Sequence, residues 1–205
     1  MLRDLNAELD LQVEVRQQLG CPIDEYDNMI NLRLDREKYR VAFPKTMDFF
    51  GQDFMRDLAT TFFRPDDFKL NYEIFSTILS ETKGPQTKPP FALHFDKWHC
   101  LKFFVYLSDT DERNGAMRAT PGSIVRNRPV RQGAMTQLSN VEEMENVVPE
   151  PAEPSIPISG PAGTMFIFDT DMNHGASRVE AGFTRRTIRT HTITLPQLQR
   201  MGYRV

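Results

Sequence analysis

Three residues of this chain have the types and spacing needed to bind a transition metal. His94 and Asp96 are two positions apart, so on a β-strand their side chains would point to the same face. His174 lies 78 positions after Asp96 and stands next to Gly175. Two imidazoles and one carboxylate on one side of an ion leave its opposite side open, which is the ligand set of non-heme Fe(II) oxygenases. His94, Asp96 and His174 are therefore the candidate catalytic metal ligands.

Each part of this set also has a simpler interpretation. A His-x-Asp pair occurs by chance and as an ion pair at strand ends, and His174 could be an incidental histidine in a turn. The pair lies between two apolar segments, however, where a charge that is neither paired nor bound to metal would be costly. This context favours a metal site.

The composition sets limits on the class of protein. A length of 205 residues suggests one domain, 1–205, and a net charge of −3 gives no electrostatic signature of nucleic-acid binding. We find no apolar run near the roughly 18 residues of a membrane helix and no signal peptide. Cys21 and Cys100 are too few for a disulfide scaffold, so we expect a soluble protein in the reducing cytoplasm.

The elements that must position the candidate ligands fall into two blocks. Residues 1–66 are expected to form a mostly helical support, because apolar residues recur there at helical spacing. Residues 67–195 are expected to form the core, in which residues 125–160, rich in proline and acids, form a loop or lid. Alternating or apolar segments predict strands at 69–75, 91–96, 101–107, 116–120, 164–168 and 186–194. Many short strands after a helical start indicate a mainly β protein with flanking helices, a double-stranded β-helix of the jelly-roll, cupin-like type.

Several motifs accompany the candidate ligands in a fixed order. An Asn114-Gly115 turn leads to Pro121-Gly122-Ser123, a strand follows Gly163, and Arg185 stands eleven positions after His174. Together with His-x-Asp, this order resembles the phytanoyl-CoA dioxygenase-like family of Fe(II)- and 2-oxoglutarate-dependent oxygenases. The resemblance extends from about Phe91 to Thr194.

The resemblance implies roles for individual residues. His94, Asp96 and His174 would bind iron, Arg185 would hold the distal carboxylate of 2-oxoglutarate, and Phe104 would line the pocket of that cosubstrate. 2-Oxoglutarate would fill two of the open coordination positions of the iron, and O2 would take the last one. Lys102 shares a strand face with Phe104, so it could meet an anionic group or extend to solvent. Arg186 is an alternative to Arg185, since only one of two neighbouring side chains faces inward, but the spacing favours Arg185.

The sequence departs from the family pattern at two positions. Ile124 follows Ser123 where the family usually has histidine, and Ala176 stands where serine is frequent. Neither position is an iron ligand. The second change removes one hydrogen bond to 2-oxoglutarate, which Ser177 or Thr187 could supply instead.

The remaining candidates concern the substrate. Trp98, His99 and Tyr72 are expected at the mouth of the site and suggest a polar or ring-shaped small molecule. The arginines between 126 and 131 would either bind an anionic substrate or solvate a loop. We thus expect oxidation of a small metabolite, including those of secondary metabolism, by hydroxylation, desaturation or cyclisation. The alternatives are a cupin-type metalloenzyme that does not use 2-oxoglutarate, for which His99 or His191 would have to join the ligands, and a non-catalytic jelly-roll binding protein.

Overall fold

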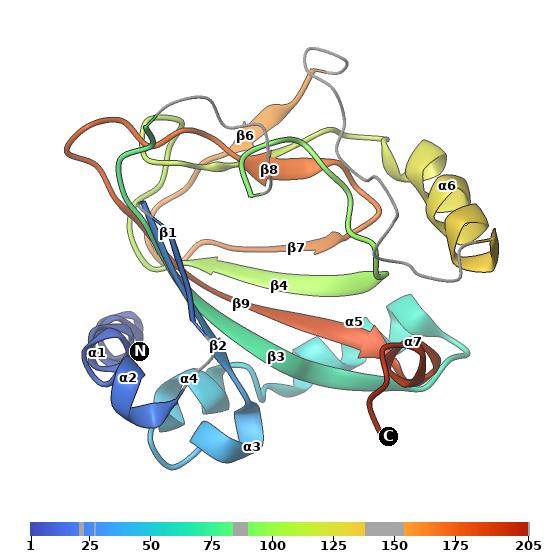
Figure 1. Ribbon diagram of the computed structural model, residues 1–205, viewed down its shortest axis with the longest axis horizontal. Coiled ribbons are helices and arrows are strands. Elements are labelled where there is room, and N and C mark those ends of the chain that lie inside the picture. The colour runs from blue at the N-terminus through green and yellow to red at the C-terminus, as the bar shows by residue number, and fades with distance from the viewer. Residues whose placement is uncertain (21–22, 27, 84–89, 138–153, 205) are drawn as a thin grey trace.

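The fold consists of two antiparallel β-sheets that face each other (Figure 1). The computed structural model describes residues 1–20, 23–26, 28–83, 90–137 and 154–204. The larger sheet has the strand order β1 (Ile23–Tyr26), β2 (Met29–Leu34), β3 (Phe68–Leu79), β9 (Arg185–Thr194), β4 (Cys100–Tyr106) and β7 (Met165–Asp169). The smaller sheet has the order β6 (Ile156–Ile158), β5 (Met117–Ala119) and β8 (His174–Ala176). The double-stranded β-helix expected from the sequence is confirmed.

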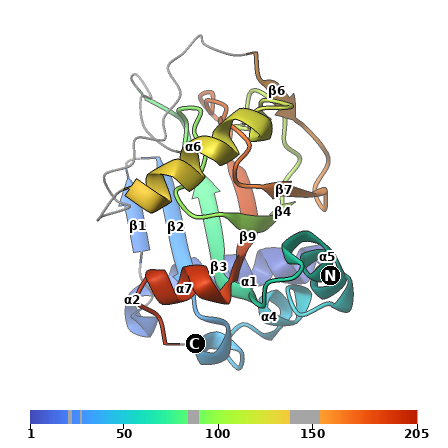
Figure 2. The same ribbon diagram turned by 90° about the vertical axis from the view of Figure 1, so that its right-hand side faces the viewer.

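Helices from the N-terminal part of the chain cover the outer face of the larger sheet (Figures 1 and 2). Apolar side chains from these helices and from the sheet form one buried core, which includes Leu9, Met55 and Phe103. The helices are α1 (Leu2–Glu14), α2 (Arg16–Leu19), α3 (Arg36–Tyr39), α4 (Pro44–Phe49) and α5 (Asp53–Phe63), with α7 (Leu195–Arg200) at the other end of the chain. None of the helices in the described part of the chain has the length and apolarity needed to span a membrane.

The alternation of side chains along the strands divides the larger sheet into two chemically different faces. On β4, Leu101, Phe103 and Val105 join the helix-side core, whereas Phe104 and Tyr106 pack in a separate cluster toward the smaller sheet. Residues of β9 alternate in the same way. The polar side chains of β4 and β9 that face the smaller sheet therefore surround the space between the two sheets.

The N-terminal block is less helical than the sequence indicated, because β1 and β2 lie inside residues 1–66. The segment of β2 alternates between apolar and polar residues, and its partner is β3, with Asn31 opposite Thr77. This period-2 signal was present in the sequence but is short. Long-range pairing with β3, rather than local helix propensity, decides its structure.

Two other expectations differ from the structure. Residues 91–96 do not form a strand, since their ladder is reduced to one isolated bridge between His94 and His174. Within 125–160, the expected loop contains helix α6 (Ile124–Gln137) and strand β6. The helix was missed because Pro129 and Gly133 interrupt the usual helical pattern. Residues 138–153 of that segment lie outside the described residues, as does Cys21. Cys100 is buried.

Candidate metal centre

The structure brings His94, Asp96 and His174 together between the two sheets. One ligand atom from each lies within 4.8 Å of the others. Oδ1 of Asp96 is 3.8 Å from Nε2 of His94 and 3.4 Å from Nε2 of His174. Both imidazoles are buried. The three donors thus converge although the segment of His94 is not a strand.

Backbone contacts hold the two histidines in register. The N–H of His94 donates to the carbonyl of His174 at 2.9 Å, and the N–H of His174 donates to the carbonyl of His94 at 2.8 Å. Nδ1 of His94 lies 2.8 Å from the carbonyl oxygen of Ala92, and Nδ1 of His174 lies 2.8 Å from that of Met172. Because a carbonyl only accepts, both Nδ1 atoms carry the proton, which leaves the Nε2 lone pairs directed at the common point. This is the tautomer that a metal ligand needs.

Lys102 fixes the carboxylate of Asp96. Its Nζ lies 2.6 Å from Oδ2, so Oδ1 remains on the side of the two imidazoles. Burial alone would raise the pKa of Asp96, but Lys102 and the two histidines hold it well below the usual range. Burial, followed by the proximity of His174, lowers the pKa of His94 to about 4. The site therefore presents an anionic carboxylate and a neutral His94 at neutral pH.

Position 175, next to His174, requires glycine because the neighbouring backbone packs closely against it. A Cβ atom at this position would lie 2.8 Å from the carbonyl oxygen of Phe91 and 3.1 Å from that of Ala92. A larger residue would push the segment of His94 away from β8. The His-Gly pair noted in the sequence thus has a steric cause.

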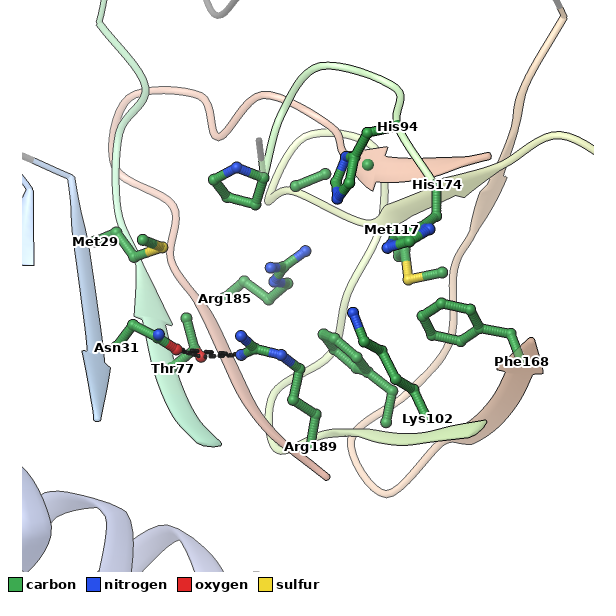
Figure 3. Close-up of a pocket in the computed structure, with 14 residues that line it drawn as sticks. Met29, Asn31, Thr77, His94, Lys102, Met117, Phe168, His174, Arg185 and Arg189 are labelled. Atoms are coloured by element: carbon green, nitrogen blue, oxygen red, sulfur yellow. Dashed lines mark hydrogen bonds between the residues drawn. The ribbon is translucent and has the colours of Figure 1, made fainter. Parts of the chain in front are cut away.

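A cavity of about 250 Å³ extends from the two histidines to the inner face of the larger sheet (Figure 3). Arg185 lines it and is 4 % exposed; one of its N–H groups donates to the carbonyl of Gly115, whereas Nε has no hydrogen-bond partner among the described residues. Burial lowers the pKa of Arg185 to about 10. An anionic ligand in this cavity would satisfy the buried guanidinium.

The other residues expected to contact 2-oxoglutarate do not all lie at this cavity. Phe104 and Lys102 line the same cavity, and Thr187 shares the strand face of Arg185 with a buried hydroxyl that has no partner among the described residues. Arg186 points to the opposite face, where it pairs with Asp10 at 2.7 Å. Ser177 is not brought to this cavity, since it lines a different one together with Arg118.

The three substrate candidates also lie in different places. Tyr72 and Trp98 line a second cavity of about 470 Å³, which reaches His94 and Asp96 from another side. His99 is not a lining residue of either cavity. Its ring packs against Phe62, and its Nε2 lies 3.1 Å from Oδ1 of Asp169.

Helix α6 is anchored beside the metal centre by the arginines that we expected in a solvated loop or at a substrate. Arg131 binds Asp171 through two nitrogens, and Arg128 contacts both Asp169 and Asp171. Asn127 donates to the side-chain oxygen of Asn173 at 2.6 Å. Although His99, Asp169 and Asp171 also place three ligand atoms within 4.8 Å, the two guanidiniums already neutralise these carboxylates. We interpret this cluster as an ionic anchor for the loop that carries His174.

Sequence reasoning missed Arg189, which also lines the first cavity. Its Nη1 donates to Oγ1 of Thr77 at 2.8 Å and to Oδ1 of Asn31 at 3.2 Å. Its position four residues after Arg185 places it on the same strand face, and this alternation was the available signal.

Comparison with known proteins places the chain in a family. The family model for phytanoyl-CoA dioxygenase (PhyH) matches residues 31–187, about three quarters of the chain. The chain belongs to the phytanoyl-CoA dioxygenase family. It is thus a member of a family of Fe(II)- and 2-oxoglutarate-dependent dioxygenases. Among curated proteins, no sequence matches this chain significantly.

Several solved structures share the fold of this family member at low sequence identity. HygX from Streptomyces hygroscopicus, solved with nickel and 2-oxoglutarate, has a TM-score of 0.57 and 13% identity over 92% of this chain and 79% of its own. The carbocyclase SnoK from nogalamycin biosynthesis, a non-heme α-ketoglutarate-dependent protein, has a TM-score of 0.59 and 17% identity over 94% and 75%. EctD from S. alaskensis, solved with bound Fe, has a TM-score of 0.56 and 17% identity over 93% and 69%.

Proposed function

We propose that this protein binds Fe(II) through His94, Asp96 and His174 and uses 2-oxoglutarate and O2 to oxidise a small-molecule metabolite. The observation that carries the proposal is the convergence of two Nε2 atoms and one carboxylate oxygen at the end of a cavity that contains the buried Arg185. Membership of the dioxygenase family supports the same assignment.

The side chains of the site fit the two absent groups. Two imidazoles and a carboxylate are suitable donors for Fe(II) and leave other coordination positions open. Arg185, with Thr187 beside it on the strand, would hold the distal carboxylate of 2-oxoglutarate, and Phe104 would line its pocket. Iron, 2-oxoglutarate and O2 together supply the oxidising chemistry, which activates a C–H bond of the substrate.

The protein's own contribution is to orient and shield this chemistry. Lys102 directs one oxygen of Asp96 to the metal position, and the Ala92 and Met172 carbonyls fix the tautomers of the two histidines. Burial of Arg185 strengthens its attraction for a carboxylate, because little water competes for the guanidinium. Tyr72 and Trp98 would contact the part of the substrate that lies in the second cavity, next to His94.

The sizes of the cavities support a small substrate. Cavities of about 250 Å³ and 470 Å³ are suited to small molecules rather than to a macromolecule. HygX was solved with hygromycin B bound, and SnoK is a carbocyclase from nogalamycin biosynthesis. We extend small molecules of secondary metabolism to this chain as the substrate class of the proposal.

The proposal is tested by metal content and by succinate formation. Purified protein supplied with Fe(II), ascorbate and 2-oxoglutarate is expected to release succinate slowly without added substrate. His174→Ala should abolish both stoichiometric metal binding and succinate release while circular dichroism shows a folded chain. His191→Gln, which changes a histidine outside the ligand set, should keep metal stoichiometry. Full metal binding by His174→Ala would refute the assignment of this residue.

The two alternative functions have less support. A cupin-type centre would need a further histidine, but His99 lies with Asp169 and His191 lies 3.7 Å from Glu73. A non-catalytic binding module would keep two buried imidazoles and a half-buried carboxylate without using them, which is costly. Failure of 2-oxoglutarate to bind the metal-loaded protein would favour the first alternative, and failure to bind any metal would favour the second.

A further inference from the structure

The cavity next to the metal centre has two differently built halves (Figure 3). On one side, Phe104, Met117 and Phe168 come from β4, β5 and β7. On the other side, Met29, Asn31 and Thr77 come from β2 and β3. Strand β9 contributes one arginine to each half, Arg185 and Arg189. The proposed cosubstrate role of Arg185 accounts for the first half only.

Arg189 is held in a fixed orientation toward the second half. Thr77 and Asn31 accept hydrogen bonds from its Nη1, and the hydroxyl of Thr77 also donates to Asn31 at 2.7 Å. The guanidinium carbon lies 4.3 Å from the centroid of the Phe75 ring. A guanidinium stacked on a ring and fixed by two hydrogen bonds loses little side-chain entropy when it binds a ligand.

The charge of the residues that line this cavity favours an anionic ligand. Lys102, Arg185 and Arg189 line the cavity, and none of its lining residues in the described part of the chain is an aspartate or a glutamate. Asp96 compensates Lys102 at the metal position. Four residues along a strand separate the backbone positions of Arg185 and Arg189 by about 13 Å. The guanidinium of Arg185 is hydrogen-bonded to Gly115 and that of Arg189 to Thr77 and Asn31, so the two arginines can serve two different anionic groups.

We propose that the organic substrate carries a carboxylate or a phosphate, and that Arg189, with Thr77 and Asn31, recognises it in the half of the cavity beside β2 and β3. This inference rests on the proposed function and deepens it by naming the substrate class. Met29 and Pro90 would contact the apolar part of such a molecule. Arg189 is then a specificity-determining residue, distinct from the cosubstrate arginine.

The test uses probes that share a trifluoromethylphenyl group and differ in the polar group attached to it, which is anionic in two probes and neutral in the third. Protein loaded with Zn(II), which is redox-inert, and with 2-oxoglutarate is titrated with 4-(trifluoromethyl)benzoate, 4-(trifluoromethyl)phenyl phosphate and 4-(trifluoromethyl)benzamide, and binding is followed by ¹⁹F NMR. At least one anion is expected to bind about tenfold more tightly than the neutral amide, and the better anion identifies the preferred group. Arg189→Gln should remove this difference, and Arg189→Lys should restore part of it. Arg56→Gln, which removes an exposed charge from α5, should bind the probes like the wild type.

Three results would overturn the inference: equal binding of anions and amide, no anion binding at all, or unchanged anion binding by Arg189→Gln. A loss of 2-oxoglutarate affinity in Arg189→Gln without any effect on the probes would place Arg189 in the cosubstrate half and would also reject it. Calorimetry of 2-oxoglutarate binding to the Zn(II)-loaded wild type reports on the proposed function separately. The probes are titrated into protein without 2-oxoglutarate as well, so the two failures remain distinguishable.

Discussion

At the scale of single residues, the orientation of two neighbouring arginines decides which of them faces the cavity. Arg185 is buried next to Phe104, whereas Arg186 turns to the helix side and contacts Asn6 and Asp10. The sequence could reduce the choice to two residues, because side chains alternate on a strand. It favoured Arg185 only through its spacing from His174.

Arg185→Gln is expected to weaken 2-oxoglutarate binding to metal-loaded protein by about 10- to 100-fold, since a charge-assisted hydrogen bond in a buried site contributes about 1.5–3 kcal/mol. Calorimetric titration measures this loss. Arg186→Gln is the matched control and should leave the affinity close to that of the wild type. An equal loss in both variants would contradict the assignment.

His191 makes the stability of the metal-free protein depend on pH. Burial lowers its pKa to about 4 from a usual value near 6.5, so the unfolded chain takes up a proton between these values and the folded chain does not. The free energy of unfolding should therefore fall as the pH falls from about 6.5 to 4. His191→Gln should reduce this slope by at most about 1.4 kcal/mol per pH unit, as measured by urea denaturation. Identical slopes for the variant and the wild type would show that His191 does not titrate in this way.

At the scale of elements, helix α6 depends on its anchor rather than on an apolar face. Arg131 and Asp171 are both buried, and Arg131→Met would leave the carboxylate without its main counter-charge. We expect a loss of at most about 3 kcal/mol in unfolding free energy, because a buried ion pair is broken while Arg128 still compensates part of the charge of Asp171. Arg126→Met, at an exposed position of the same helix, should change it by less than about 0.5 kcal/mol.

The same variant tests whether the anchor positions His174, the proposed metal ligand. Asp171 and Asn173 belong to the loop that ends at His174, and both are bonded to α6. Arg131→Met should therefore weaken Zn(II) binding relative to Arg126→Met in a competition assay at a temperature where both variants are folded. Equal metal affinities would limit the anchor to a role in stability.

The sequence predicted those elements whose local pattern agrees with their final packing. Strands β4, β7 and β9 are long or strongly apolar and lie within one residue of their expected bounds, whereas β3 continues four residues beyond the expected 69–75. Strand β2 and helix α6 were missed because partners far along the chain determine them: β3 for the first and Asp171 for the second. The convergence of His94, Asp96 and His174 could be predicted from residue types and order, whereas Arg189 and the anchor required the three-dimensional arrangement.

At the scale of the whole molecule, the residues that form the apolar core and the residues of the candidate site lie on opposite faces of the larger sheet. Phe103 is fully buried on the helix side, and the neighbouring Lys102 and Phe104 face the cavity. Phe103→Ala is expected to lower the unfolding free energy by about 3–5 kcal/mol through the loss of buried aromatic surface. Zn(II) affinity of the folded fraction should remain close to that of the wild type. A parallel loss of metal affinity would show that the two faces are not independent.

The reciprocal backbone bonds between His94 and His174 have a consequence for metal uptake. They join the two imidazole-bearing segments through the main chain, so the proposed metal site would be assembled before an ion arrives. Capture of the ion would then require little reorganisation of the chain. Protein stripped with a chelator should accept fresh metal at a rate proportional to metal concentration, without a slower step that reflects rearrangement.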